Sequence, residues 1–214
     1  MRDYMSTLTI GVISQKGGVG KSTLVRAVAT EFARNEYKVL IADMDTSQTT
    51  VTTWGADRLR NGVEPRVYAE PFSKVSDLKR HKENYDLAVI DGAPASNRQT
   101  IEIAELSNYL VLPTKVTLDD LRPQIKLAHE LVKRGISRKK LGFVLSMVGK
   151  STAEIEGAKE YIEEAGYECL GFIPQKDSIG QAHDTGRSAL ETPFASVNKA
   201  VDKVVEEISN QLRK

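Results

Sequence analysis

The sequence predicts an α/β fold, a doubly wound and mainly parallel β-sheet with helices on both faces. Short apolar runs alternate with longer amphipathic segments along the chain, and this alternation favours right-handed β-α-β units. Several of the apolar runs are almost uninterrupted, which is typical of parallel strands buried on both sides. A glycine-rich segment also follows the first apolar run directly, at the strand end where folds of this class place their ligands.

Each element is predicted from its own pattern. The strands are the compact apolar runs at residues 7–13, 38–42, 87–90, 109–112, 141–147 and 169–173, and residues 66–69 form a weaker candidate. The helices are the segments with a helical apolar period, at residues 21–35, 49–60, 118–134, 152–165 and 194–212. Because no repeat, low-complexity tract or Pro/Gly/Ser-rich linker divides the 214 residues, we expect one domain over residues 1–214.

The composition excludes several kinds of site. With 30 basic and 29 acidic side chains the net charge is +1, so any nucleic-acid binding has to come from a local patch. The single cysteine, Cys169, excludes an intrachain disulfide and a multi-cysteine metal site, and we expect it to be a small buried residue. Residues 1–14 are too polar for a secretion signal, and no apolar run approaches the roughly 20 residues that span a bilayer. We therefore expect a cytoplasmic protein.

The glycine-rich segment is typical of a loop that binds a nucleoside triphosphate. Residues 14–23 read Ser-Gln-Lys-Gly-Gly-Val-Gly-Lys-Ser-Thr. Glycines allow a turn so tight that successive backbone N–H groups face phosphate oxygens, and the following helix adds the positive end of its dipole. In this pattern Lys21 reaches the β- and γ-phosphates and the Ser22 hydroxyl binds Mg²⁺, although Gln15 stands where the usual motif has glycine. The expected phosphate contacts are Gly17, Gly18, Val19, Gly20, Lys21, Ser22 and Thr23.

A second lysine, Lys16, stands at the front of the loop and gives Lys-Gly-Gly-Val-Gly-Lys-Ser-Thr. This segment resembles the deviant Walker A motif of the ParA/MinD family of P-loop ATPases, dimeric proteins that position cargo in the cell. The resemblance implies that Lys16 crosses a dimer interface and contacts the ATP of the partner subunit. A cation supplied in this way acts as an arginine finger does in other nucleotide hydrolases, where the effect on rate is on the order of 10³–10⁵.

Two acidic strand ends extend the resemblance. Residues 43–48 read Asp-Met-Asp-Thr-Ser-Gln, where the family commonly has Asp-x-Asp-Pro-Gln and its second aspartate helps to position the attacking water. That role falls on Asp45, in a loop that is one residue longer because Thr-Ser replaces the proline. Asp43 either shares the site or caps the next helix.

The strand at residues 85–94 resembles a Walker B segment. It delivers Asp91 toward the phosphates, where a carboxylate can hold the water shell of Mg²⁺, and Gly92 lets the chain turn close to the γ-phosphate. Pro174 and the two residues after it stand where the family has its adenine-contacting loop. The resemblance spans almost the whole chain and is most specific at residues 14–23, 43–48 and 85–94. The expected catalytic residues are Lys16, Lys21, Asp45 and Asp91, with Ser22 and Asp91 at the metal.

The resemblance is strongest to small ParA-type partition ATPases. The first strand begins near residue 7, so we expect no amino-terminal helix-turn-helix extension and no operator binding. The implied cycle starts with an ATP-dependent homodimer that binds DNA without sequence preference and is therefore associated with the nucleoid. A ParB-like or other adaptor then stimulates hydrolysis and release. The cargo could be a plasmid, a chromosome origin, a carboxysome or a chemoreceptor cluster.

Basic residues that could contact DNA occur in two groups, although the pattern of each favours an ordinary solvated surface. One group is Arg187 with Lys199, Lys203, Arg213 and Lys214, and the other is Arg134 with Arg138, Lys139 and Lys140. The three histidines, His81, His129 and His183, lack the spacing of metal ligands, and Trp54 is expected to be a packing residue.

Two other functions remain open from the sequence. A MinD-like ATPase would insert a terminal amphipathic helix into a membrane. Here the terminal stripe (Phe194, Val197, Val201, Val204, Val205, Ile208, Leu212) has small branched residues and mixed charges opposite, which favours docking on the protein itself over a stable membrane anchor. A metabolic P-loop ligase is the other alternative, and Lys16 argues against it. An iron-protein reductase would need more than one cysteine per subunit.

Overall fold

The computed structural model describes residues 7–94 and 97–214. A seven-stranded sheet in the order β3-β2-β4-β1-β5-β6-β7 forms its centre, and each pairing is parallel. The predicted fold class is confirmed. The strands are β1 (Leu8–Val12), β2 (Val39–Asp43), β3 (Tyr68–Pro71), β4 (Leu87–Asp91), β5 (Tyr109–Thr114), β6 (Leu141–Val148) and β7 (Glu168–Pro174).

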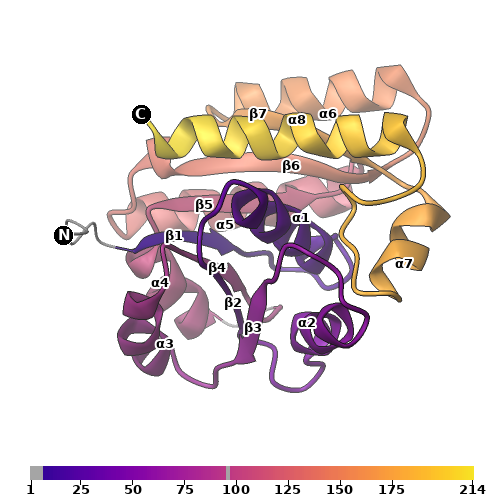
Figure 1. The fold of residues 1–214 in the computed structure, drawn as a ribbon. Helices are drawn as coiled ribbons and strands as arrows, with labels where there is room; N and C mark the ends of the chain where they lie inside the picture. Colours follow the sequence, from indigo (N-terminus) through magenta and orange to yellow (C-terminus); the bar gives the residue numbers. More distant parts are fainter. Residues whose placement is uncertain (1–6, 95–96) are drawn as a thin grey trace.

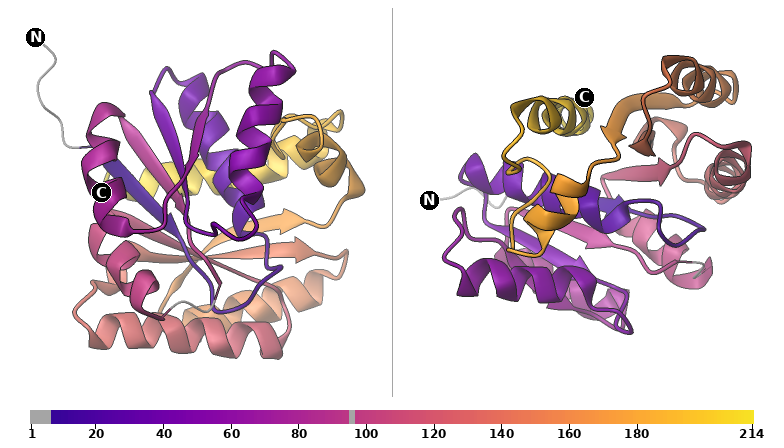
Figure 2. Two further views of the ribbon diagram at one scale, coloured as in Figure 1. Left: turned by 90° about the horizontal axis from the view of Figure 1, so that it is seen from below. Right: turned by 90° about the vertical axis from the view of Figure 1, so that its right-hand side faces the viewer.

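Helices cover both faces of the sheet (Figure 1). The faces are separated because side chains alternate along each strand: in β2, Val39 and Ile41 join one core, and Leu40 and Ala42 the other. In the left view of Figure 2 the sheet separates the yellow α8 from α5 and α6. One layer holds α1 (Lys21–Arg34), α2 (Thr50–Arg60), α7 (Asp177–His183) and α8 (Ala195–Leu212), and the other holds α3 (Val75–His81), α4 (Asn97–Leu106), α5 (Leu118–Lys133) and α6 (Thr152–Glu164).

The strand register brings the acidic strand ends to one place. Strand β1 lies between β4 and β5, and its last residue, Val12, pairs with Asp91 at the end of β4. Asp91 in turn pairs with Asp43 at the end of β2. The phosphate loop and both carboxylates therefore meet at the carboxyl edge of the sheet, where parallel sheets bind ligands.

The predicted elements are present, with two differences. Strand β3 lies at Tyr68–Pro71, two residues beyond the weak candidate at residues 66–69. Three helices, α3, α4 and α7, have no counterpart in the prediction. Helices α3 and α7 have seven residues each, which is too short for a helical period to stand out from a loop.

The terminal helix α8 packs on the protein itself. Its apolar stripe is buried in the core shared with α1 and β7, and Val201 and Ile208 are fully inaccessible. Phe194 departs from the predicted stripe, because it precedes the helix and its surface is 55% exposed. Over residues 7–94 and 97–214, none of the helices has the length and apolar character needed to cross a membrane.

Candidate functional site

The phosphate loop wraps the amino-terminal end of α1. Gly20 caps this helix with φ of 84°, and Gly18 has φ of 69°, a left-handed region that favours glycine. The loop and the neighbouring strand ends enclose a cavity of about 340 Å³, into which the unpaired amides and the positive dipole end of α1 can attract phosphate. Of the expected contacts, Gly17, Gly18, Gly20, Lys21, Ser22 and Thr23 line the cavity.

The cationic side of the cavity comes from α1. Lys21 is buried, and burial lowers the pKa of its ammonium while the charges of Asp91 and Asp45 oppose the shift. Arg26, one turn further along, also lines the cavity and donates to the carbonyl oxygen of Thr50 at 3.0 Å. No motif in the sequence points to Arg26, which brings a second positive charge to the same cavity.

The front of the loop is held by α5, a contact that the sequence analysis missed. Gln124 accepts from the backbone N–H of Gln15 at 3.3 Å and donates to the Ile13 carbonyl oxygen at 2.8 Å. The Ser14 hydroxyl donates to the Lys16 carbonyl oxygen at 2.7 Å and accepts from the Lys16 N–H at 3.1 Å. Gln15 is not among the non-glycine residues with a positive φ, so its backbone conformation does not require a glycine at this position.

Lys16 points away from the cavity that the loop encloses. It is not among the residues that line it. Its ammonium instead lies 3.0 Å from Asp120 Oδ1 on α5, and its side chain is 43% exposed. Val19 also lies outside the cavity lining and is buried. Within a single subunit, Lys21 is thus placed to bind its own phosphates and Lys16 is not.

Ser22 and Asp91 form a candidate Mg²⁺ site. The Ser22 hydroxyl lies near the Asp91 carboxylate and lowers its pKa, and Asp91 Oδ1 is buried without a hydrogen-bond partner among the described residues. Burial raises the pKa of Asp91 to about 6, against the opposing effects of Ser22 and Lys21. An unpaired buried carboxylate oxygen beside a hydroxyl suits a hard cation, which would favour the ionised form. The residues therefore fit Mg²⁺.

Two aspartates, one at the end of β2 and one just after it, line the cavity. Asp43 is buried, and its carboxylate accepts from the Asp45 N–H at 3.2 Å, from the Thr52 N–H at 3.1 Å and from the Thr52 hydroxyl at 3.0 Å. Asp43 thus fixes the start of α2 and at the same time lines the cavity. Asp45 lines the cavity and accepts from the Ser47 hydroxyl at 2.6 Å. A carboxylate beside the phosphate site can orient a water molecule there.

A second cavity, of about 320 Å³, adjoins the first. Pro174 lines it, and Gly20, Thr23 and Met147 border both cavities. Its wall includes Ser146 Oγ and His183 Nε2, buried atoms without a hydrogen-bond partner in the part of the chain that the structure describes. Burial and the charge of Arg26 lower the pKa of His183 to about 3, so the ring is neutral. Unpaired polar atoms in a cavity next to the phosphates suit a nucleoside.

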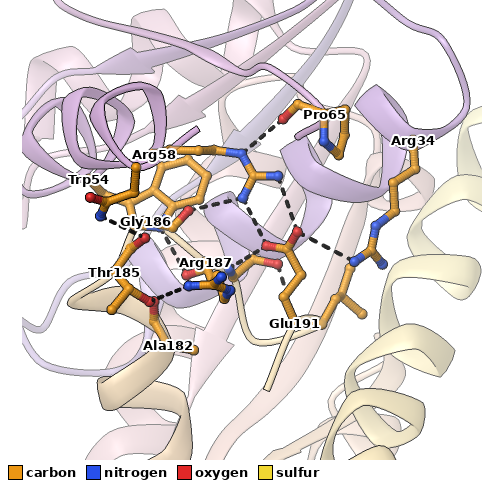
Figure 3. A network of polar contacts seen from close by, with 12 residues as sticks. Arg34, Trp54, Arg58, Pro65, Ala182, Thr185, Gly186, Arg187 and Glu191 are labelled. Carbon is orange, nitrogen blue, oxygen red and sulfur yellow. Dashed lines mark hydrogen bonds and ion pairs between the residues drawn. The ribbon is translucent and has the colours of Figure 1, made fainter. Parts of the chain in front are cut away.

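A buried ion pair ties together the two sides of the site (Figure 3). Arg58 on α2 is 1% exposed and binds both carboxylate oxygens of Glu191, at 2.8 and 3.1 Å. Arg58 also donates to the carbonyl oxygens of Gly186 and Pro65, both at 2.9 Å. Trp54 lies under its guanidinium and donates to the Arg187 carbonyl oxygen at 2.9 Å. This clasp joins α2, which follows Asp45, to the segment that follows α7, and α7 itself borders the second cavity.

The other singled-out residues lie elsewhere. Arg187, Lys199, Lys203, Arg213 and Lys214 are exposed, whereas Arg138 donates to the Ala165 carbonyl oxygen at 2.9 Å and Lys140 to that of Ser107 at 3.4 Å. His81 pairs with Glu70, and His129 with the Tyr167 hydroxyl. Cys169 is partly buried.

Replacing Asp91 with asparagine is expected to lower Mg²⁺ affinity on the order of 10–100-fold, because the amide removes the charge from the buried ligand. The measurement is a Mg²⁺ titration of the protein bound to a fluorescent ATP analogue. Glu83→Gln, an exposed charge near the opposite end of β4, serves as the control. A Mg²⁺ response of Asp91→Asn equal to that of the wild type would contradict the assignment.

Comparison with known proteins gives the family. The model of the CobQ/CobB/MinD/ParA nucleotide binding domain matches residues 10–189. Among curated proteins, the chain is 25% identical to an uncharacterized ATP-binding protein of Methanocaldococcus jannaschii, over 94% of this chain and 96% of that protein. It is 26% identical to the maintenance of carboxysome distribution protein A of Gloeobacter kilaueensis, over 96% and 95%. It is 27% identical to an iron-sulfur cluster carrier protein of Saccharolobus solfataricus, over 94% and 84%.

Solved structures share the fold. The cell division ATPase MinD of Pyrococcus furiosus has a TM-score of 0.78 at 20% identity, over 96% of this chain and 99% of MinD. Cyanothece apo McdA has a TM-score of 0.77 at 18% identity, over 95% and 100%. MinD of Pyrococcus horikoshii in complex with Mg-ADP has a TM-score of 0.76 at 20% identity, over 95% and 96%. Since the family model covers most of the chain, the protein belongs to the CobQ/CobB/MinD/ParA nucleotide-binding family.

Proposed function

We propose that this protein is a ParA-type positioning ATPase, which alternates between a monomer and an ATP-bound dimer. The observation that carries the proposal is that two lysines of one loop point to different places. Lys21 faces the subunit's own phosphate cavity, and Lys16 lies outside it with a half-exposed ammonium. A lysine at the front of a phosphate loop that does not serve its own site is available to serve the site of a second subunit.

The proposed chemistry uses few groups. Lys21 and the loop amides bind the phosphates, and Asp45 orients the attacking water. Ser22 and Asp91 hold Mg²⁺, which neutralises phosphate charge when bound. Lys16 of the opposite subunit adds the last positive charge, so hydrolysis proceeds only in the dimer.

The relatives support a positioning role. One is named for carboxysome distribution, and the fold is shared with McdA and MinD. The iron-sulfur carrier relative suggests another activity, but such clusters are commonly held by four cysteine thiolates. A dimer of this chain offers one cysteine, Cys169, from each subunit. A lipid anchor in α8 is also disfavoured, because the apolar stripe of this helix is already packed on α1 and β7.

We place the DNA-binding surface of the dimer on the layer of α7 and α8. Arg187, Lys199 and Lys203 are exposed there, and Lys199 and Lys203 are one turn apart on one helix face. The competing group near residue 138 is partly engaged, since Arg138 caps the end of α6 and Lys140 binds the Ser107 carbonyl oxygen. An adaptor protein then triggers hydrolysis and release.

The test of this function is DNA binding as a function of nucleotide and salt. Fluorescence anisotropy with a random-sequence duplex should show binding with a non-hydrolysable ATP analogue and little binding with ADP. The affinity should fall steeply with salt. In the double variant Lys199→Ala/Lys203→Ala the slope of log K against log salt should fall by about 2, about 1 for each lost phosphate contact. Arg134→Ala/Lys139→Ala, the matched control, should keep the wild-type slope. Equal DNA binding in all nucleotide states, or ATP-dependent binding to liposomes in its place, would contradict the proposal.

A further inference from the structure

The partner that Lys16 has within its own subunit is held in a fixed position. Asp120 Oδ1 accepts from the Lys16 ammonium at 3.0 Å, and Oδ2 accepts from the Thr117 hydroxyl at 2.8 Å. The Asp120 side chain is 15% exposed, against 43% for Lys16. Both carboxylate oxygens are therefore satisfied, and the more exposed, longer lysine is the member of the pair that can move.

Helix α5 supplies the rigidity. Thr117 precedes the helix in an extended conformation, and its carbonyl oxygen accepts from the Asp120 N–H at 3.0 Å. Gln124, four residues after Asp120 and so on the same helix face, binds the backbone of the loop at Ile13 and Gln15. One face of α5 therefore binds the loop backbone through Gln124 and, one turn earlier, the Lys16 ammonium through Asp120.

The charge state of Asp120 suits this contact. Burial raises the pKa of its carboxyl, but the hydrogen bonds from Thr117 and Lys16 and the charges of Lys16 and Lys115 outweigh it, so the pKa lies below its usual range. The carboxylate is ionised at neutral pH and attracts the ammonium.

We propose that Asp120 is a positioning residue that holds the Lys16 ammonium in its own subunit. When a partner subunit loaded with a nucleoside triphosphate approaches, the phosphates of that nucleotide take the place of the Asp120 carboxylate. This inference rests on the proposed role of Lys16 in the dimer. Asp120 is fixed on the subunit of Lys16, whereas the phosphates that Lys16 would contact lie on the other subunit, so the ammonium exchanges one anion for the other.

The exchange favours triphosphate over diphosphate. One carboxylate carries a single negative charge, and a γ-phosphate adds charge and acceptor oxygens that a diphosphate lacks. With ADP bound, the competition thus favours Asp120. The contact therefore raises the dimer dissociation constant and makes dimerisation depend more strongly on the γ-phosphate.

The experiment compares dimer dissociation constants by analytical ultracentrifugation with a non-hydrolysable ATP analogue and with ADP. In Asp120→Asn, the constant with the ATP analogue is expected to fall by about 5- to 25-fold, because two half-exposed ion pairs of up to about fivefold each no longer have to break. Dimers should also appear with ADP. Asparagine can still accept from Thr117, so the helix start is preserved. Asp119→Asn, the same change at the exposed neighbour, should behave as the wild type.

A double variant separates positioning from a structural effect. In the Lys16→Ala background, Asp120→Asn should leave the protein monomeric with both nucleotides, as Lys16→Ala alone is, since the group that Asp120 retains is gone. Dimers of this double variant would mean that Asp120→Asn acts on the structure and not through Lys16. A wild type that dimerises with the ATP analogue, together with an Asp120→Asn variant that dimerises equally or less well, would overturn this inference alone. A wild type that stays monomeric with the analogue would overturn the proposed function and this inference together.

Discussion

Replacing Lys16 with alanine is expected to lower ATP hydrolysis on the order of 10³-fold or more and to abolish the ATP-dependent dimer, while the monomer still binds nucleotide. The reason is the direction of the side chain. Lys16 does not line the cavity of its own subunit, whereas Lys21 and the loop glycines do. Losing Lys16 therefore leaves the phosphate cradle intact and removes a charge that acts elsewhere.

Two measurements on each variant check this result. Light scattering with a non-hydrolysable ATP analogue reports the dimer, and phosphate release reports hydrolysis. Lys126→Ala removes an exposed lysine from α5 and should match the wild type in both. ATP-dependent dimers of Lys16→Ala with normal hydrolysis would refute the role of Lys16.

Replacing Arg58 with leucine is expected to lower the free energy of unfolding by about 3 kcal/mol or more, the usual cost of removing one partner of a buried ion pair. Arg58 is 1% exposed, and its loss leaves Glu191 beside unpaired carbonyl oxygens of Gly186 and Pro65. The segment at Gly186 passes so close to the backbone of Arg58 that no Cβ would fit there. The surrounding backbone therefore has little room to rearrange around the lost side chain. Urea denaturation at pH 7 measures the change.

The matched control is Arg60→Leu, two residues away on the same helix. Arg60 is 73% exposed and pairs only with Asp57 among the salt bridges of the described chain, so its loss should cost no more than about 0.5 kcal/mol. Similar losses in the two variants would contradict a buried clasp.

The clasp also predicts a dependence on pH. Burial raises the pKa of Glu191, but the hydrogen bonds from Arg58 and Ser188 and the charge of Arg58 hold it below its usual value. The folded carboxyl thus binds a proton less readily than the unfolded one, whose pKa is about 4.3. Its contribution to stability is complete above that pH and is lost as the pH falls through the folded value. The difference in unfolding free energy between wild type and Arg58→Leu should therefore shrink in acid.

Local signals in the sequence predict the fold and the phosphate loop. The loop is a contiguous string between a strand and a helix, and Asp91 follows an apolar run directly, so neither depends on knowing which segments meet in space. Short helices such as α3 and α7 carry too few residues to show a period.

Contacts between residues that are far apart in the sequence could not be predicted from local patterns. Asp120 lies 104 residues from Lys16, and Glu191 lies 133 residues from Arg58. For the contact between Asp120 and Lys16 there was only a weak local signal, because Thr-Leu-Asp-Asp at residues 117–120 has the form of a helix start. Nothing local indicates that this helix faces the phosphate loop. Asp43 combines both of its alternatives, because it accepts hydrogen bonds from Thr52 on α2 and also lines the phosphate cavity.

The most direct test of the dimer mechanism is complementation between two inactive variants. Lys16→Ala keeps its own phosphate cavity and Asp45, and Asp45→Ala keeps its own Lys16. If Lys16 acts on the nucleotide of the opposite subunit, mixing the two variants assembles one complete site, Asp45 from the first and Lys16 from the second, and phosphate release recovers. If the mixture stays as inactive as its components while the two chains are shown to associate, Lys16 does not act across the interface.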